Sequence, residues 1–160
     1  MRFLPTSRRG LWTTFAVFAA LSVVFGVVMA LFDFAIIDEM WEPAAILAHV
    51  EAMSPAQRTA HAWLTGTVDV AYPFAYAALF GGLAVAAFPQ ARWLALPILL
   101  CVPADLVEGL SQVMILSGHE EWVAAKAVAT PIKLVLFSLG VLIGLAGLIR
   151  LVVQRKRPAA

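Results

Sequence analysis

The stretch that decides the fold is residues 10–33, GLWTTFAVFAALSVVFGVVMALFD, because no charged residue occurs between Arg9 and Asp33. At a rise of about 1.5 Å per residue, its apolar part forms a helix about 34 Å long, which is enough to cross a bilayer. A cleaved signal peptide has an apolar core of only about 7 to 15 residues, so we expect this helix to be retained. The whole chain agrees, since 62% of its residues are hydrophobic and 13% are charged.

Three more apolar segments follow the first, at about 63–88, 93–116 and 123–149. The joints between these three segments, 89–92 and 117–121, are so short that neighbouring helices must be antiparallel. The sequence therefore predicts an all-α integral membrane protein. We expect a single transmembrane domain over residues 1–160, folded as a four-helix antiparallel bundle.

The connection over residues 34–62 is the one sizeable segment outside the expected spans. Glu42 and Pro43 favour the start of a short helix, because proline is tolerated in a first helical turn. Its apolar face would consist of Ile46, Leu47, Val50 and Met53. We expect this short amphipathic helix to lie on the outer membrane surface. Ser54 and Pro55 then predict an N-cap, so the second long helix can begin before it enters the bilayer.

Basic residues gather on one side of the predicted bundle. They are Arg2, Arg8, Arg9, Arg92, Arg150, Arg155, Lys156 and Arg157. The opposite side carries Asp38, Glu39, Glu42, Glu51, Glu120 and Glu121 against Arg58 and Lys126. The rule that cytoplasmic segments are rich in lysine and arginine predicts that both termini are cytoplasmic, in a multi-pass protein of the inner (plasma) membrane of a bacterium. The net charge of +1 gives no reason to expect nucleic-acid binding.

Four charged residues fall well inside the predicted spans, namely Asp69, Asp105, Glu108 and Lys133. An ion in hydrocarbon costs several kcal/mol unless it is paired or hydrated, so such residues are where function is expected first. Since Lys133 is the one cation of the four, we expect it to pair with Glu108 or Asp105.

The helical spacing places these charges on inward faces. The third helix has a polar stripe of Cys101, Asp105, Glu108 and Gln112. The fourth has a stripe of Lys126, Thr130, Lys133, Phe137, Gly140, Gly144 and Gly147. On the second helix Asp69, Pro73 and Tyr76 share a face, and on the first Gly26, Ala30 and Asp33 predict the packing side. We expect the glycines of the fourth helix to allow close packing within the bundle.

These faces predict a polar pocket between the outer halves of the helices. Asp105 and Glu108 are the candidates for acid–base chemistry, since paired carboxylates in an apolar site can share a proton. The expected ligand-contacting residues are Asp33, Asp69, Tyr72, Tyr76, Gln112 and Lys133. The histidines show no metal-ligand spacing and no cofactor motif occurs, so we expect neither a metal nor a cofactor.

Part of this layout resembles the EXPERA group, which includes emopamil-binding sterol isomerases and the sigma-2 receptor. The resemblance rests on four helices with cytoplasmic ends, Asp33 at the end of the first, a long outer connection, and VDVAYPFAY at 68–76. It implies a membrane-embedded pocket for sterols or amphiphilic amines, with ligand-facing Asp33 and Asp69. The isomerases also use a histidine near the acid of the second helix. The span 63–88 has none, and His61 precedes it, so the resemblance does not extend to sterol isomerisation.

The chain is also similar to small four-span bacterial membrane proteins that have no established activity. Those proteins carry an aspartate and Tyr-Pro in span two, Asp-Leu-x-Glu in span three and a lysine in span four. The matching residues here are Asp69, Tyr72-Pro73, Asp105-Leu106-Val107-Glu108 and Lys133.

Three hypotheses from different classes follow from these observations. The first is a membrane-embedded pocket for a hydrophobic or amphiphilic small molecule, with or without acid–base chemistry. The second is a small proton-coupled transporter, which four helices would form by assembling as a homodimer. The third is an accessory or assembly subunit of a membrane complex, in which the buried charges only fix helix packing. The expected partners are membrane lipids, the small-molecule ligand and a second copy of the chain.

Overall fold

The computed structural model describes residues 3–156, and these residues contain helices and no strand. The elements are α1 (Arg8–Phe32), α2 (Pro43–Ala52), α3 (Pro55–Ala87), the 3-10 turn η1 (Arg92–Ala95), α4 (Leu96–Leu116), the 3-10 turn η2 (Glu120–Trp122) and α5 (Val123–Lys156). The all-α prediction is confirmed. Four helices are long and apolar enough to cross a membrane, as the sequence predicted. Arg2 and Arg157, on which the expected orientation partly rests, lie outside the described residues.

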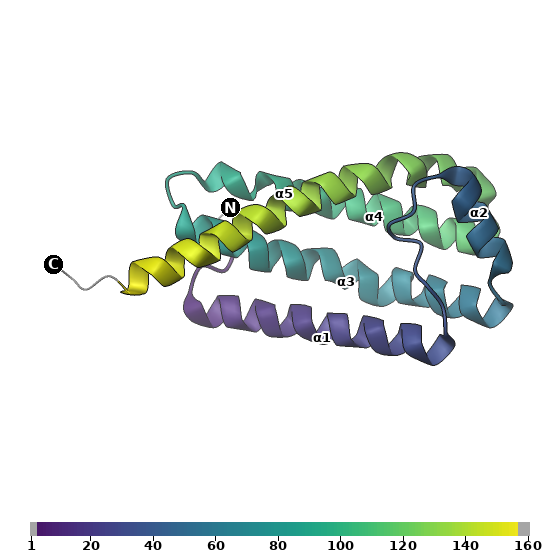
Figure 1. The fold of residues 1–160 in the computed structure, drawn as a ribbon, viewed down its shortest axis with the longest axis horizontal. Helices are drawn as coiled ribbons and strands as arrows, with labels where there is room; N and C mark the ends of the chain where they lie inside the picture. The colour runs from purple at the N-terminus through teal and green to yellow at the C-terminus, as the bar shows by residue number, and fades with distance from the viewer. Residues whose placement is uncertain (1–2, 157–160) are drawn as a thin grey trace.

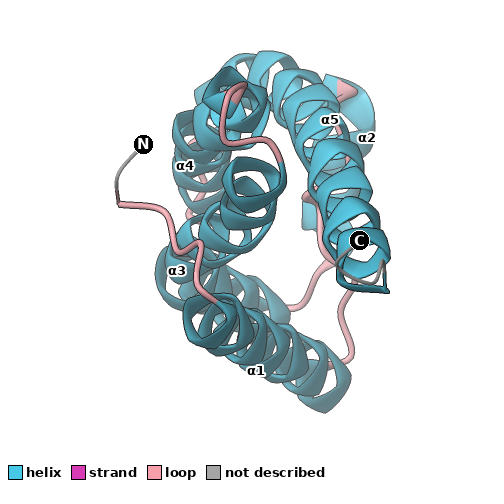
Figure 2. Ribbon diagram, turned by 90° about the vertical axis from the view of Figure 1, so that its left-hand side faces the viewer, coloured by secondary structure: helices cyan, strands magenta, loops and turns pink. Residues whose placement is uncertain are grey.

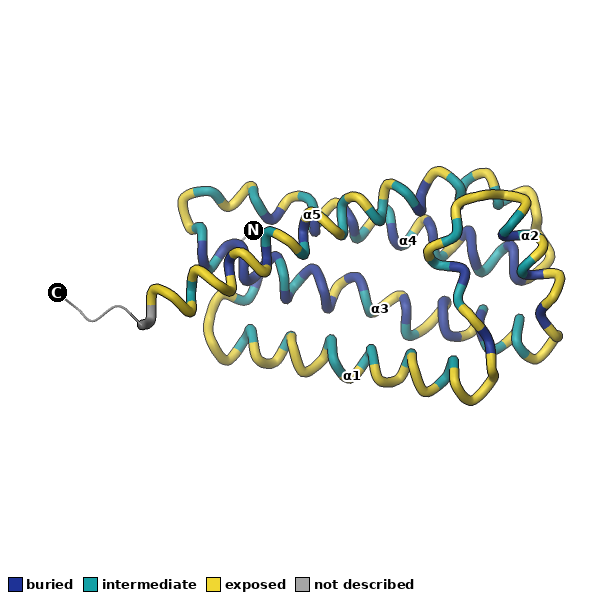
Figure 3. The backbone as a smooth tube through the Cα atoms, in the orientation of Figure 1, coloured by how far each residue is buried: buried dark blue, intermediate teal, exposed yellow. Residues whose placement is uncertain are grey.

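The long helices α1, α3, α4 and α5 lie side by side along the longest axis of the molecule (Figure 1). Helix α3 packs on the other three, whereas α1 packs mainly on α3. The view along the bundle shows α1 at its edge, set apart from α5 (Figure 2). Burial follows this arrangement, because α3 carries more buried positions than any other helix and α1 has none (Figure 3). Helix α3 is therefore the centre of the fold.

The packing side of α1 differs from the prediction. Gly26 and Asp33 are exposed, and a Cβ added to Gly26 would meet no atom within 4 Å. The contact with α3 is made instead by aromatic rings, since Phe18 and Phe25 lie 5.2 and 5.8 Å from the ring of Tyr72. The predicted face of small residues was wrong because bulky side chains on α1 fill the space beside α3, and close backbone approach is not needed there.

The start of α3 agrees with the predicted cap. Ser54 Oγ accepts a hydrogen bond from the backbone N–H of Gln57, and the Ser54 N–H donates to Gln57 Oε1, which is a complete capping box. The helix consequently runs for 33 residues, which is about 50 Å at 1.5 Å per residue. It begins eight residues before the apolar span at 63–88, so His61 belongs to the same helix as Asp69.

Helix α2 covers one end of the bundle. Its predicted apolar face is confirmed in that Ile46, Val50 and Met53 are buried. They pack in one cluster with residues of α3 and α4 and of the connecting segment, including Leu64 and Ile115. The face expected to lie on lipid therefore packs against the protein itself, and it holds the connecting segment 33–42 over the end of the helices.

The glycines of α5 lie where neighbouring helices approach closely. A Cβ added at Gly140 would lie 2.5 Å from Ile98 Cβ, and one added at Gly144 would lie 2.8 Å from the ring of Phe80. Real side-chain contacts are not this short, so α5 can pack on α3 and α4 in this way only with glycine at these positions. The prediction that these glycines serve packing within the bundle is confirmed.

Replacing Gly140 by alanine should destabilise the protein by about 1–3 kcal/mol, because the new methyl group overlaps Ile98. Gly26→Ala is the matched control, since its methyl group enters open space and should be neutral or slightly stabilising. Thermal unfolding of both variants in the same detergent measures the difference. Equal melting temperatures for the two variants would contradict the packing of α5 described here.

Candidate functional site

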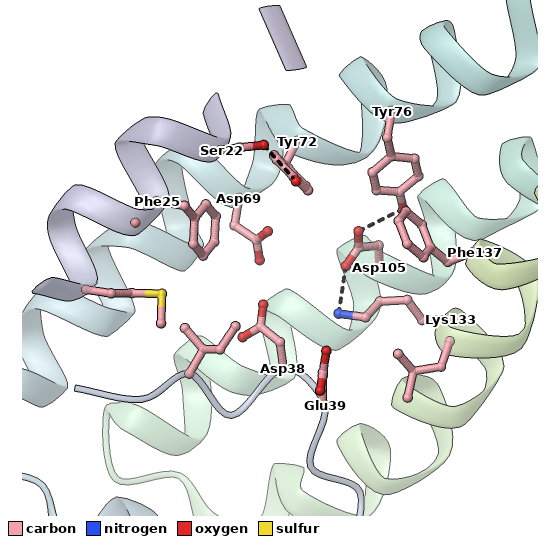
Figure 4. Close-up of a pocket in the computed structure, with 14 residues that line it drawn as sticks. Ser22, Phe25, Asp38, Glu39, Asp69, Tyr72, Tyr76, Asp105, Lys133 and Phe137 are labelled. Carbon is pink, nitrogen blue, oxygen red and sulfur yellow. Dashed lines mark hydrogen bonds and ion pairs between the residues drawn. The ribbon is translucent and has the colours of Figure 1, made fainter. Parts of the chain in front are cut away.

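A cavity of about 430 Å³ lies between α1, α3, α4, α5 and the connecting segment 33–42. We call it the acidic cavity, because four carboxylates and one ammonium group line it. The charged residues are Asp38, Glu39, Asp69, Asp105 and Lys133. The uncharged lining consists of Ser22, Phe25, Gly26, Met29, Ile36, Tyr72, Tyr76, Leu134 and Phe137. Figure 4 shows these side chains converging from the long helices α1, α3, α4 and α5 and from the segment 33–42.

Asp105 lies at the inner wall of the acidic cavity and is held on both sides. Tyr76 donates its hydroxyl hydrogen to Asp105 Oδ2 at 2.8 Å, and Lys133 Nζ lies 3.2 Å from Oδ1. The ring of Phe137 meets the ring of Tyr76 edge to face at 5.0 Å. The carboxylate therefore has a donor for each oxygen, and its position is fixed by α3 and α5 together.

Beneath this wall, Glu108 is fully enclosed. Its Oε1 accepts hydrogen bonds from Lys126 and from Thr130, and its Oε2 accepts one from Lys133 at 3.0 Å. Glu108 and Lys126 have no exposed surface. Two ammonium groups thus compensate one buried carboxylate, and Lys133 joins Glu108 to Asp105. A charge in an apolar interior requires a partner of opposite charge, and this network supplies one for each of the fully buried ions, Glu108 and Lys126.

The connecting segment is joined to the same network through Asp38. Gln112 donates from Nε2 to Asp38 Oδ1 at 2.7 Å and accepts from Lys126 Nζ at 2.9 Å. His61 Nε2 lies 3.8 Å from Asp38 Oδ1. Burial raises the pKa of Asp38, but His61, Lys133, Gln112 and Lys126 outweigh it and lower this pKa to about 2. Asp38 is therefore ionised and pinned, which holds residues 33–42 over the mouth of the acidic cavity.

Asp69 differs from Asp38 and Asp105, since no hydrogen bond or ion pair joins it to another described residue, and it differs from Glu39 in being buried. Its exposed fraction is 8%, and the surface that remains faces the acidic cavity. Figure 4 shows its carboxylate pointing toward Asp38 across the cavity, with Phe25 beside it. A buried carboxylate without a donor is costly, so this position favours a partner supplied from outside the chain.

The structure brings most of the predicted site residues together. Asp69, Tyr72, Tyr76, Asp105 and Lys133 all line the acidic cavity. The expected partnership of Lys133 is confirmed with both acids, Asp105 and Glu108.

Three predicted site residues lie elsewhere. Glu108 and Gln112 are enclosed beneath the cavity and do not line it. Asp33 is exposed, and here the prediction needs correction. The residue ends α1 in a left-handed conformation with φ 49°, and its carbonyl oxygen accepts from Gln57 Nε2 at 2.6 Å. The chain turns at Asp33, which directs the next residues across the bundle, so Asp38 lines the cavity instead.

Sequence reasoning missed three residues of this region. Lys126 and Asp38 were assigned to the outer surface, and His61 was placed before its span. The i, i+4, i+7 spacing of Lys126 with Thr130 and Lys133 did place it on the inward face of the fourth helix, but it was not expected to join the buried charges. For His61 the signal was the N-cap at Ser54, because a helix that begins there includes His61 two turns before Asp69. Asp38 lies in a non-helical segment that has no periodicity, and no sequence pattern pointed to it.

The arrangement can attract and orient a cation. With all its carboxylates ionised, the acidic cavity has an excess of acid, and aromatic rings that can face a cation line it. Among the described residues, no group of three or more His, Cys, Asp or Glu side chains could hold a metal ion. The cavity volume falls within the range of about 300–1,000 Å³ typical of small-molecule sites.

Comparison with known proteins yields no relative, because no family model, curated protein or solved structure matches the chain.

Replacing Lys126 by methionine should lower the free energy of unfolding by about 3–5 kcal/mol, because it leaves Glu108 with fewer buried partners. Adding Glu108→Gln to this variant should restore at least about 1 kcal/mol, since the unpaired charge is then removed. Chemical unfolding of wild type, both single variants and the double variant gives the coupling energy. Strictly additive effects would contradict a direct ion pair between Lys126 and Glu108.

Lowering the pH should remove the part of the folding stability that the ionised Asp38 contributes. Its pKa in the folded protein, about 2, lies below the ordinary value of 3.8, so its contribution is complete above pH 3.8 and is lost as pH falls toward 2. Asp38→Asn should therefore show a smaller loss of melting temperature between pH 4 and 2 than the wild type. Asp33→Asn removes an exposed carboxylate nearby and is the control, and an equal change in both variants would refute this role for Asp38.

Proposed function

We propose that the protein is an integral membrane protein that binds an amphiphilic small molecule with a cationic group in the acidic cavity. The four long apolar helices support a membrane location, with the bundle crossing the bilayer in antiparallel fashion. The clustering of arginines near the two termini and near Arg92 supports cytoplasmic ends and a bacterial inner membrane. The acidic cavity then opens in the outer half of the membrane.

The observation that carries the proposal is the position of Asp69. Every other ionisable residue deep in the bundle has a partner of opposite charge or a hydrogen-bond donor, whereas Asp69 has neither among the described residues. The ammonium group of a ligand placed between Asp69 and Asp38 would give Asp69 a partner and would reduce the repulsion between the two carboxylates. Such a group also explains why two like charges face one another in the fold (Figure 4).

The remaining lining suits the apolar part of the ligand. Phe25, Tyr72 and Phe137 present aromatic surface, and Met29 and Leu134 add aliphatic surface. A cation held over an aromatic face gains about 0.5–2 kcal/mol beyond the ion pair. A free inorganic cation would leave this apolar surface unused, so the lining favours an organic amine.

Access from the membrane follows from the weak packing of α1 on α5. The two helices line opposite sides of the acidic cavity, and α1 packs mainly on α3 rather than on α5. Gly26 of α1 lines the cavity but has no side chain, and open space adjoins it, so α1 closes the cavity least at this residue. We infer that a lipid-soluble ligand enters sideways past Gly26.

Binding accounts for the geometry better than catalysis by a pair of acids. Glu108 is enclosed by Lys126, Lys133 and Thr130 and has no surface in the acidic cavity. Of the two acids expected to do acid–base chemistry, only Asp105 could touch a ligand, and both its oxygens already accept hydrogen bonds or face Lys133. We therefore assign Glu108 a positioning role and Asp105 a place in the wall of the binding site.

The first test compares two probes of equal chain length, N,N-dimethyldodecylamine and 1-dodecanol, by native mass spectrometry in a non-ionic detergent. Wild type should bind the amine more tightly than the alcohol. Asp69→Asn should weaken amine binding by about tenfold or more, because hydrogen bonds to charged groups contribute about 1.5–3 kcal/mol, and should leave alcohol binding unchanged. Asp33→Asn is the matched control and should change neither.

Gly26→Phe extends the same test to the entrance. The new ring enters open space, so the variant should fold normally but bind both probes less. Val27→Phe is its control, because Val27 is exposed and does not line the acidic cavity. If wild type shows no preference for the amine and Asp69→Asn changes only stability, the charges serve packing alone. The accessory-subunit hypothesis would then replace this proposal.

A further inference from the structure

A second cavity, of about 350 Å³, lies at the opposite end of the molecule from Asp38. It is formed where α1 begins, α3 ends and the last turns of α5 pass by, on the left of Figure 1. We call it the arginine cavity, because Arg8 and Arg92 line it together with Thr6. It shares no lining residue with the acidic cavity.

The charge of the arginine cavity is uncompensated. Neither Arg8 nor Arg92 forms an ion pair within the described residues, and the side chain of Arg92 donates only a 3.3 Å hydrogen bond, from Nε to the carbonyl of Pro89. The sequence has no acidic residue before Asp33, after Glu121 or in 70–104, so none is available at this end. The guanidinium groups are therefore free to take an anion from outside the chain.

The cavity is built by packing that fixes the N-terminal segment. Leu4 is buried in a cluster with Ala84, Val85 and Ala95. The segment crosses α3 so closely that a Cβ added at Gly82 would overlap the carbonyl of Pro5. This contact places Thr6 and the first turn of α1 beside Arg92. The N-terminus of a long helix adds unpaired backbone N–H groups that favour negative charge.

The rest of the lining is apolar and continues toward the membrane-spanning part of the helices. Leu11, Val85 and Leu151 form it, one from each of α1, α3 and α5. Trp12 and Trp93 are exposed at the same end, where indole rings are typical of the membrane interface. A charged mouth over an apolar floor at this depth matches a lipid, whose phosphate lies in the headgroup region and whose chains extend into the hydrocarbon.

We propose that the arginine cavity binds the headgroup of an anionic phospholipid. The phosphate takes hydrogen bonds from the guanidinium groups of Arg8 and Arg92 and from the hydroxyl of Thr6, and an acyl chain lies along Leu11, Val85 and Leu151. Guanidinium groups suit this role because they bind phosphate oxygens in a bidentate way. This site does not depend on the proposed function of the acidic cavity.

The test is native mass spectrometry of the full chain titrated with dioleoyl phosphatidylglycerol and, separately, with dioleoyl phosphatidylcholine. The variant Arg8→Gln/Arg92→Gln removes both guanidinium groups of the cavity. The variant Arg9→Gln/Arg150→Gln removes the same net charge from the same end without touching the lining, and it is the matched control. The cavity variant should lose at least about tenfold more affinity for phosphatidylglycerol than the control, because specific guanidinium–phosphate bonds add to the general attraction of a basic surface.

The outcomes separate this site from its alternatives. Equal losses in the two double variants would overturn the proposal, since they would show only diffuse attraction to a basic surface. Equal binding of phosphatidylcholine and phosphatidylglycerol by the wild type would overturn it too. Competition by free glycerol phosphate at the concentration of the lipid would show a phosphate site rather than a lipid site. Arg92→Gln alone, at an exposed position, gives a second test if the double variant unfolds, and it should weaken phosphatidylglycerol binding selectively.

Discussion

The enclosed carboxylate of Glu108 is the constraint on which the rest of the bundle depends. With no exposed surface and an apolar surround, it must be compensated inside the protein, and the two nearest cations come from one face of α5. Among the described acids Lys126 forms an ion pair with Glu108 alone, whereas Lys133 forms ion pairs with both Glu108 and Asp105. Two lysines thus serve two acids, and no cation remains for Asp69. The unpaired acid in the acidic cavity is a consequence of how the buried charges are shared.

The same network determines where the connecting segment lies. Gln112 accepts from Lys126 with one end of its amide and donates to Asp38 with the other, so the segment 33–42 is tied to the ions of the bundle by a single side chain. Helix α2 adds apolar packing through Ile46 and Val50, but this contact fixes the end of the segment rather than its middle. Gln112 and His61 both contact Oδ1 of Asp38, so a cation in the acidic cavity can approach the other oxygen, Oδ2, without displacing Gln112.

Most of the fold could be predicted from the sequence, because hydropathy and helical periodicity are local properties. The four long helices, the cap at Ser54, the polar stripe on α4 and the close packing of Gly140 all follow from spacing along the chain. Lys126 was misplaced because it lies only three residues inside the expected start of its span, and its burial depends on Glu108 and Gln112 of α4, which its own helical spacing does not report. Asp33 was expected in the pocket, where the structure has Asp38. The direction of the chain after α1 depends on one backbone conformation, φ 49° at Asp33, which hydropathy does not report.

The two cavities have linings of opposite charge, and this separation follows from where acidic residues occur along the sequence. No carboxylate occurs in 70–104, so α3 passes from Asp69 to the arginine cavity without any group that could neutralise Arg8 or Arg92. An amphiphilic cation is attracted by the carboxylates at one end and repelled by the guanidinium groups at the other. An anionic lipid experiences the reverse. Because a charge cannot cross the apolar middle of the bundle cheaply, each cavity is insulated from the ligand of the other. The dipolar distribution of charge that suggested an orientation in the membrane thus also gives each end its own chemistry.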